Sequence, residues 1–193
     1  MKTKFTFLII LSVFLLNTNS FSQDFGCNAK IDASNEYIDI GNNTDYYGTS
    51  LTVEARINAD SWKTNIHEGT VLSCGTWNGG ECGWDLRAAN NGKLSFNFSN
   101  GSGWHETMTT TNPMLINQWY HVAATFDNGV VNVYIDGVLI ETQTFAFNIA
   151  PSTTNLYIGT CPAETSRNFD GYIDEVRIWN IALDESTILA WYN

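Results

Sequence analysis

Apolar and polar residues alternate in short runs along most of the chain from Ser50 onward. A period of two over four to eight residues is typical of β-strands that bury one face and expose the other. The clearest runs lie at 51–57, 94–98, 120–126 and 131–135. Only residues 184–189 have a helical pattern, with Asp184 as the candidate N-cap. The chain is therefore predicted to be all-β, with one short helix near its C-terminal end.

Turn dipeptides separate the apolar runs. Asn-Gly stands at 91–92 and at 128–129, and Asp-Gly stands at 136–137. These dipeptides favour the positive φ angles of tight hairpin turns, so the strands that they connect are expected to be antiparallel. Many short antiparallel strands with regular turns indicate a β-sandwich or a jelly roll.

Three longer segments carry a family resemblance. They are residues 118–127 (QWYHVAATFD), 133–139 (VYIDGVL) and 169–179 (FDGYIDEVRIW). Together they resemble the laminin-G-like jelly roll of the concanavalin A-like lectin/glucanase superfamily, over roughly residues 31–189. The resemblance implies an antiparallel jelly-roll β-sandwich. Because the same sandwich carries lectins, adhesion modules and glycosidases, the resemblance does not by itself fix a function.

The resemblance also implies how the two ends of the domain meet. In similar domains the closing strand, here 169–179, pairs beside the first strand, here 30–40. Trp119 and Trp179 lie within the recognisable motifs. They are interpreted as core residues, since burying one large aromatic side chain removes about 150–250 Å² from water.

The N-terminal segment, residues 1–22, is interpreted as a secretory signal peptide. Lys2 and Lys4 precede an apolar run at 5–16, and a polar stretch with small residues follows it. A membrane-spanning helix needs about 18 apolar residues, and neither this run nor any later stretch approaches that length. We therefore expect a soluble protein, secreted or periplasmic, with a single domain over 23–193 and without membrane insertion.

The composition is acidic, with a formal net charge of −11. Loss of Lys2 and Lys4 with the signal peptide makes the mature chain more negative by two charges, because residues 1–22 contain no acid. Such a surface repels phosphate backbones, so nucleic acid is not expected as a partner. The acidity is interpreted mainly as a contribution to solubility outside the cell, with cation binding as the alternative.

Four cysteines in an exported chain suggest two disulfides, because that compartment is oxidising. Cys27, Cys74, Cys82 and Cys161 allow three connectivities, among which the sequence alone does not decide. The leading hypothesis joins Cys74 to Cys82, which flank a Gly-rich loop, and Cys27 to Cys161, which lie near the chain ends. A lipid anchor on Cys27 is a weaker alternative, because the residues before it are a poor match to a lipobox.

The sequence lacks the common catalytic motifs. Glycosidases on this fold resemble one another in a strand with Glu-x-Asp-x-x-Glu, whose alternate carboxylates act on the glycosidic bond. The nearest approaches are Glu36 with Asp39, whose side chains take opposite faces of a strand, and Asp170 with Asp174, which lack the third acid. The zinc-protease and Gly-x-Ser-x-Gly patterns are also missing. The chain is therefore predicted not to be an enzyme.

Asp174 is a candidate metal ligand. In a regular strand it shares a face with Val176 and Ile178, where a carboxylate is costly to bury unless it is paired or coordinated. In one interpretation Asp174 accepts hydrogen bonds from the neighbouring turn. In the other it binds calcium, which takes six to eight oxygen ligands. Similar sandwiches hold calcium between the closing strand and the turn after the first strand, which implies Asp32 and Asn35 as further ligands.

Large aromatic residues in polar loops are the candidates for ligand binding. Trp77 and Trp104 lie in loops rich in Gly, Asn and Ser, where an aromatic ring suits stacking on a sugar. Arg87, His105 and Glu106 are expected to supply hydrogen bonds to the same ligand.

The sequence thus favours a secreted, non-catalytic carbohydrate-binding module for a neutral or cationic glycan. An alternative is that the loop tryptophans fold back as plugs, which is the favoured interpretation for Trp84. In that case the function could be that of a calcium-dependent adhesion module, which binds a cell-surface or matrix protein through an acidic rim. A divergent glycosidase or lyase is the third hypothesis.

Overall fold

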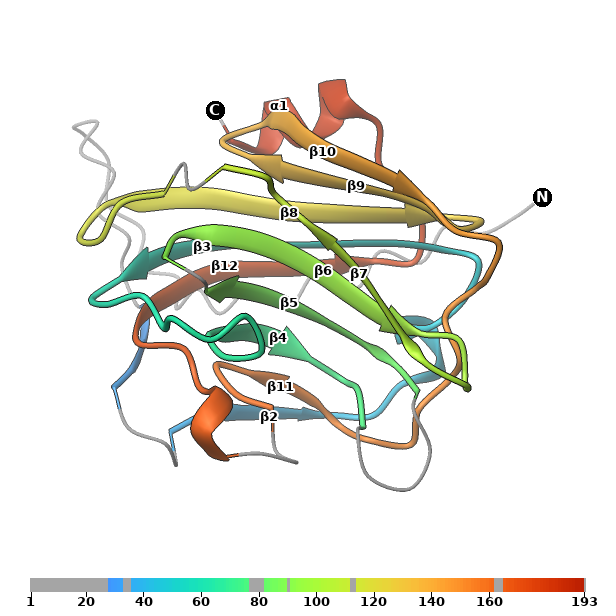
Figure 1. Ribbon diagram of the computed structural model, residues 1–193, viewed down its shortest axis with the longest axis horizontal. Helices are drawn as coiled ribbons and strands as arrows, with labels where there is room; N and C mark the ends of the chain where they lie inside the picture. The colour runs from blue at the N-terminus through green and yellow to red at the C-terminus, as the bar shows by residue number, and fades with distance from the viewer. Residues whose placement is uncertain are drawn as a thin grey trace, which may run out of the picture.

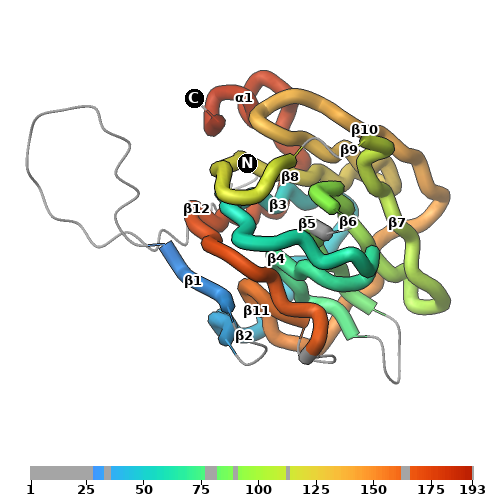
Figure 2. The backbone as a smooth tube through the Cα atoms, turned by 60° about the vertical axis from the view of Figure 1, so that its left-hand side comes forward, coloured from blue at the N-terminus to red at the C-terminus, as the bar shows by residue number. Residues whose placement is uncertain are grey.

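The computed structural model describes residues 28–32, 36–76, 82–89, 91–111, 114–161 and 165–192. These residues form two antiparallel sheets of six strands each, packed face to face (Figure 1). Figure 2, turned from that view, shows the two layers and the helix α1 (Glu185–Tyr192) outside them. The predicted all-β jelly-roll sandwich with one short helix is confirmed.

Sheet A has the strand order β1-β12-β3-β8-β9-β10. Its strands are β1 (Ala29–Ile31), β12 (Gly171–Trp179), β3 (Ser50–Ala59), β8 (Trp119–Asp127), β9 (Val130–Ile135) and β10 (Val138–Thr144). Sheet B has the order β2-β11-β4-β5-β6-β7. Its strands are β2 (Ile38–Gly41), β11 (Leu156–Ile158), β4 (Thr70–Ser73), β5 (Trp84–Ala89), β6 (Lys93–Ser99) and β7 (Trp104–Met108). Strands far apart in sequence are thus neighbours in both sheets, as in a jelly roll.

The three predicted hairpin turns are confirmed by their backbone angles. Both residues of each dipeptide have positive φ: 62° and 93° at 91–92, 48° and 88° at 128–129, and 51° and 74° at 136–137. Two successive positive φ angles define the turn whose twist matches that of the flanking strands. The turns connect β5 to β6, β8 to β9 and β9 to β10.

The core lies between the two sheets and collects the inward residues of the alternating runs. Trp84 is fully buried there, and its indole nitrogen donates to the backbone oxygen of Tyr46 at 2.7 Å. The indole stacks on Phe96 with 6.1 Å between the ring centroids. Trp84 is therefore a buried plug, as expected. Other fully buried apolar side chains are Phe98, Phe126, Phe169, Leu51, Ile57, Leu72, Leu86, Leu94 and Met114.

Trp119 and Trp179 are not core residues, and the expectation that they are is wrong. Both are partly buried on the outer face of sheet A. Trp119 precedes the core residue Tyr120, so the alternation of the strand directs it outward. Its ring centroid lies 6.4 Å from that of Tyr172. Trp179 donates from its indole nitrogen to Glu54 at 3.0 Å.

A β-bulge in β12 changes the phase of the closing strand. The register shifts between Asp174 and Arg177, where β12 carries one residue more than β3. Glu175 in the bulge has a φ of 47°. Ile173 before the bulge and Ile178 after it are both buried in the core, although a regular strand places residues five apart on opposite faces. The expectation that Asp174 and Ile178 share a face is therefore wrong.

The predicted first strand is divided between the two sheets. Its beginning, β1, pairs with β12, so the closing strand does lie beside the first strand as expected. Its end, β2, pairs instead with β11 in sheet B. The chain thus passes from one sheet to the other between Ile31 and Ile38, which a single strand over 30–40 does not allow.

The helix α1 lies on the outer face of sheet A. It begins after Asp184, whose Oδ1 accepts the backbone N–H of Thr187 at 2.8 Å, as expected of an N-cap. Ile188 is fully buried and packs with Ala123 and Tyr134 of sheet A. The helix therefore covers part of one outer face, while no α-helix lies on the outer face of sheet B within the described residues.

Candidate functional site

The outer face of sheet B carries three of the five side chains that we predict to bind a ligand. Arg87 lies on β5, and Trp104 and Glu106 lie on β7. Because residues two apart point to the same side of a strand, Trp104 and Glu106 share the side of β7 that faces away from the core. The predicted partner Trp77 lies outside the described residues.

His105 lies on the opposite side of β7. Its ring stacks on Phe147 with a centroid distance of 4.8 Å and an interplanar angle of 16°. It is also 5.2 Å from the ring of Phe98, which belongs to the core. The structure therefore does not bring His105 to the other predicted ligand residues, since adjacent residues of one strand take opposite faces.

Two polar residues outside the predicted set complete this group. The register of β5, β6 and β7 aligns Asp85, Asn97 and Glu106 in one row across the three strands. Asp85 and Arg87, two apart in a strand with apolar neighbours, form a polar face that the sequence pattern alone could have revealed. We call Asp85, Arg87, Asn97, Trp104 and Glu106 the sheet B cluster.

Asp85, Arg87 and Asn97 form a buried network at the base of the sheet B cluster. The Arg87 guanidinium donates to Asp85 Oδ2 at 2.6 Å, and the two side chains are 2% and 1% exposed. The Asn97 amide donates to Asp85 Oδ1 at 2.8 Å and contacts Ser95 Oγ at 3.1 Å. A buried ion pair requires such further hydrogen bonds to offset desolvation. The network therefore holds these side chains in a fixed arrangement.

The two carboxyl groups of the sheet B cluster have perturbed acidities. Burial raises the pKa of Asp85, while the charge of Arg87, the hydrogen bond from Asn97 and the charge of Arg167 oppose this rise. Burial also raises the pKa of Glu106, and Arg87 opposes the rise while Asp85 adds to it. Unlike Asp85, Glu106 is only partly buried. Glu106 is thus the carboxyl group of the cluster that solvent and ligands can reach.

The Trp104 ring lies against the backbone of Gly75, directly after β4. A Cβ atom at Gly75 would lie 2.6 Å from Cη2 of the indole. Since β5 and β6 separate β7 from β4, the ring extends across the sheet surface. Trp104 remains partly exposed in this position. It therefore forms part of the floor of this face, beside the loop that begins at Gly75.

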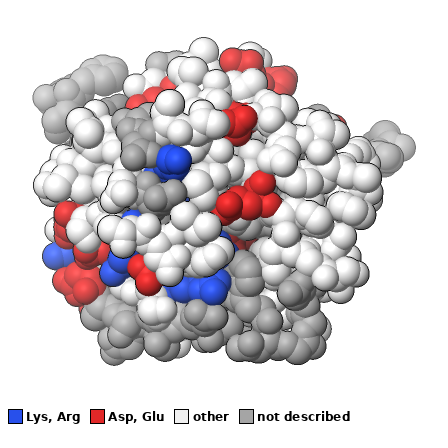
Figure 3. Space-filling model, viewed as in Figure 1, with Lys and Arg blue, Asp and Glu red and all other residues white. Residues whose placement is uncertain are grey.

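Figure 3 shows the outer face of sheet B in space-filling form, viewed as in Figure 1. Acidic residues lie near the middle of the view, in the region of β6 and β7, with basic residues to their left. The face thus presents both signs of charge on a largely uncharged background.

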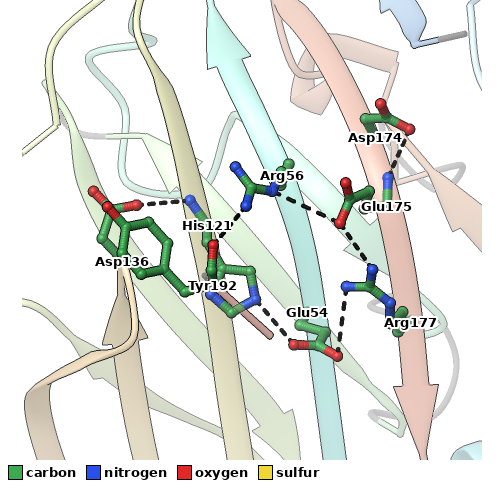
Figure 4. Close-up of polar contacts among 8 residues, drawn as sticks. All are labelled: Glu54, Arg56, His121, Asp136, Asp174, Glu175, Arg177 and Tyr192. Atoms are coloured by element: carbon green, nitrogen blue, oxygen red, sulfur yellow. Dashed lines mark hydrogen bonds and ion pairs between the residues drawn. The ribbon is translucent and has the colours of Figure 1, made fainter. Parts of the chain in front are cut away.

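A second polar group lies on the outer face of sheet A (Figure 4). It consists of Glu54, Arg56, His121, Glu175 and Arg177, which we call the sheet A cluster. The His121 Nε2 atom lies 2.9 Å from Glu54 Oε2, and Arg177 Nη2 lies 2.8 Å from Glu175 Oε2. Weaker ion pairs join Arg56 to Glu175 at 3.7 Å and Arg177 to Glu54 at 3.9 Å. Residues from β3, β8 and β12 are thus connected in one network.

The helix α1 and the residues that follow β12 cover the sheet A cluster. The Arg56 guanidinium donates to the backbone oxygen of Tyr192 at 2.7 Å. The Arg177 guanidinium lies 4.7 Å from the centre of the Trp191 ring, a cation–π arrangement. Glu54 and His121 are almost completely buried as a result. This arrangement leaves little room for a ligand.

Comparison with known families matches the chain to the model described as the concanavalin A-like lectin/glucanases superfamily, over residues 32–189. The chain belongs to this superfamily. The resemblance carried by the three sequence motifs is thereby confirmed. No curated protein matches the sequence.

Solved structures similar to this superfamily member include two with bound sugars. One is domain 4 of the extracellular arabinanase AbnA from Geobacillus stearothermophilus in complex with arabinotriose. It has a TM-score of 0.68 and 21% identity, with 86% of this chain and 76% of that chain covered. The other is the CBM40 of the Ruminococcus gnavus IT-sialidase bound to α2,3-sialyllactose. It has a TM-score of 0.70 and 17% identity, with 86% of this chain and 96% of that chain covered.

A third similar structure is the heptameric SAP-like pentraxin from Limulus polyphemus, with a TM-score of 0.58 and 19% identity. The match covers 81% of this chain and 81% of that chain. At these identities the likeness concerns the fold, which superfamily members use for different functions.

Two of the three predicted calcium ligands, Asp32 and Asp174, lie apart. The register of β1 and β12 pairs Ile31 with Gly171, so Asp32, the next residue, lies about four positions from Asp174 along the strand pair. At roughly 3.3 Å per residue this separation is about 13 Å. Asp174 instead accepts the backbone N–H of Glu175 at 2.8 Å, while Asp32 lies 3.3 Å from Lys30. The third predicted ligand, Asn35, lies outside the described residues.

The described residues contain no group of three or more His, Cys, Asp or Glu side chains placed to hold a metal ion. Calcium binding by this superfamily member stays a prediction. No helix in the described part of the chain is long and apolar enough to cross a membrane. The predicted signal peptide, residues 1–22, lies outside the described residues.

The cysteine pairing also stays a prediction. Cys74 is a buried free thiol in this structure, and burial raises its pKa. The bridge between Thr76 and Cys82 makes Cys74 and Cys82 diagonal neighbours rather than direct partners. Diagonal neighbours lie about 7–8 Å apart, more than the usual Cα separation in a disulfide. Cys27 lies outside the described residues, so its pairing with Cys161 is not placed.

Proposed function

We propose that this chain is a secreted, non-catalytic carbohydrate-binding module and that the sheet B cluster contacts the sugar. The observation that carries the proposal is the placement of the partly exposed Trp104 and Glu106 on one sheet face, beside the buried Arg87. An aromatic ring beside fixed polar groups is the composition that sugar binding requires. Two similar structures are complexes with arabinotriose and with α2,3-sialyllactose, which supports the same class of ligand.

Each residue of the sheet B cluster has a role in this proposal. The partly exposed Trp104 ring offers an apolar surface to the C–H face of a sugar. Glu106 accepts hydrogen bonds from hydroxyl groups beside that ring. Asp85 and Asn97 hold Arg87 in place beneath them. A rigid base of this kind limits the conformational entropy that binding would otherwise cost.

The decisive experiment is a glycan array with the purified mature chain, residues 23–193, followed by calorimetry on the best ligand. Replacing Trp104 by Ala should weaken binding by about 1–3 kcal/mol, the contribution of one buried large side chain. Trp191→Ala is the matched control, because Trp191 is 38% exposed and lies on the sheet A side. A folded Trp104→Ala variant that binds like the parent would place the site elsewhere.

Calcium remains the second part of the proposal, and the adhesion-module alternative depends on it. The supporting observation is that burial raises the pKa of Asp174, which is a carboxyl group that a cation would stabilise in its charged form. A ligand that binds only the folded state raises stability by about 2.7 kcal/mol at a hundred times its Kd. Melting temperatures should therefore fall in EDTA and recover with calcium. Identical melting temperatures in EDTA and in calcium would remove calcium from the proposal.

A further inference from the structure

The sheet B cluster also bears on which glycans are bound, an inference that rests on the proposed function. The cluster contains two carboxyl groups, Asp85 and Glu106, and the guanidinium of Arg87. Arg167 of the 3-10 helix η2 (Thr165–Arg167) is a further cation whose charge acts on Asp85. Within this group of four side chains, the two acids and the two arginines therefore balance in formal charge.

Arg87 is already engaged by a buried acid of the protein. Its guanidinium lies 2.6 Å from Asp85 Oδ2, and Asn97 occupies the other oxygen of Asp85 at 2.8 Å. A sugar carboxylate that took Arg87 would have to displace Asp85 and leave a buried charge without its partner. Separating a buried ion pair in this way is strongly unfavourable. Arg87 is thus a support for the site and not a receptor for acidic sugars.

Glu106 is placed to meet the ligand itself. It stands at the end of the polar row on β7, an edge strand, and it is only partly buried. An ionised carboxyl group accepts hydrogen bonds but donates none. The hydroxyl groups of a neutral sugar can donate to it, whereas the carboxylate of an acidic sugar cannot and is repelled by its charge.

We infer that the sheet B cluster selects neutral, hydroxyl-rich oligosaccharides and that Glu106 is the residue that discriminates against acidic sugars. The Trp104 ring, two residues away on the same side of β7, accepts neutral and acidic sugars alike. Selectivity therefore comes from Glu106, and affinity comes in large part from Trp104.

The test uses neutral oligosaccharides, among them arabinotriose and lactose, arrayed beside their sialylated or uronate-bearing derivatives. At pH 7 the parent should bind its best neutral ligand at least tenfold more tightly than the acidic derivative. Glu106→Gln keeps the shape of the side chain and removes its charge, so this preference should narrow to below threefold. Glu185→Gln is the matched control, since it makes the same charge change at an exposed position of α1.

A pH series provides the second measurement. Lowering the pH towards 5 should protonate part of Glu106, whose pKa is raised by its burial and by the charge of Asp85 and is lowered by the charge of Arg87. The preference of the parent should then narrow, while that of Glu106→Gln should stay constant. A parent that prefers acidic derivatives, or a Glu106→Gln variant with the full parental preference, overturns this inference alone. If the parent binds none of the arrayed glycans, the proposed function is overturned, and this inference with it.

Discussion

The two outer faces of the sandwich carry polar clusters of similar composition but opposite access. In the sheet A cluster both oxygens of Glu54 are engaged, one by His121 and one by Trp179, and the helix α1 lies above them. In the sheet B cluster Asp85 is engaged in the same way, but Glu106 is left partly open. One acid at the end of a row thus distinguishes a closed network from a candidate binding face.

This difference indicates what each cluster contributes. A buried network that a helix covers fixes the packing of the helix on the sheet, and it fails when one member is removed. A network that is buried at its base and open to solvent at one end can hold a binding surface rigid. The following predictions test whether stability and binding divide between the two faces in this way.

The largest expected effect is on stability when Glu54 is replaced by Gln. The change leaves the buried His121 without its acid, while Arg177 keeps Glu175, and breaking a buried pair costs about 3–5 kcal/mol. Urea unfolding monitored by tryptophan fluorescence measures this loss. The same substitution at Glu106 should change the free energy of unfolding by less than about 1 kcal/mol. Equal losses at the two positions would refute the division between the faces.

A smaller loss is expected when the helix α1 loses its anchor. Ile188 is fully buried against Ala123 and Tyr134, so Ile188→Ala should lower the free energy of unfolding by about 2 kcal/mol. This value is at the lower end for such truncations, because the cluster in which Ile188 packs is small. Leu189→Ala is the matched control at a position that is 43% exposed. Glycan binding should be unchanged in both variants. A loss of binding in Ile188→Ala alone would show that the covered face contributes to the site.

Gly75→Ala should test the position of the Trp104 ring. The added methyl group would lie 2.6 Å from the indole, and such overpacking costs about 1 kcal/mol or somewhat more. It should also weaken glycan binding, because the ring has to move. Trp104→Phe in the Gly75→Ala background should recover part of the stability, which a double-mutant cycle measures. Additive losses would mean that the two residues are not in contact.

The smallest expected effect is a change in the pH dependence of stability. Because burial raises the pKa of Glu106, the folded state binds its proton more tightly than the unfolded state does. Stability should therefore fall as the pH rises from the ordinary glutamate pKa through the raised value. Glu106→Gln should remove this contribution, so its stability relative to the parent should increase with pH over that window. A difference in the free energy of unfolding that does not change with pH would contradict the raised pKa of Glu106.

The sequence was sufficient for the fold because its signals are local. Alternation and turn dipeptides are properties of neighbouring residues, and the backbone angles at 91–92, 128–129 and 136–137 confirm what they predict. The bulge at Glu175 has no such signal, since it is defined by the register against β3. The outward position of Trp179 depends on that bulge and was therefore missed.

The candidate site was predictable only in part. Trp104 is predicted to lie in a loop but begins the strand β7, and the alternation of that strand turns His105 away from the face that carries Arg87 and Glu106. Asp85 and Asn97 come from different strands, and only the pairing of β5 with β6 brings them together. The sheet A cluster was not predicted at all, because it joins β3, β8 and β12 across more than a hundred positions of sequence.

The bulge of β12 has a consequence for the length of the chain. On either side of it, Asp174 pairs with Arg56 and Arg177 pairs with Glu54. Deletion of the extra residue would leave both of these pairs in place, at the cost of the local contacts of the bulge. Deletion elsewhere in the strand would instead turn every following side chain to the other face. The bulge is therefore the position of the closing strand where natural variants can lose a residue without changing the register of the rest of the strand against β3.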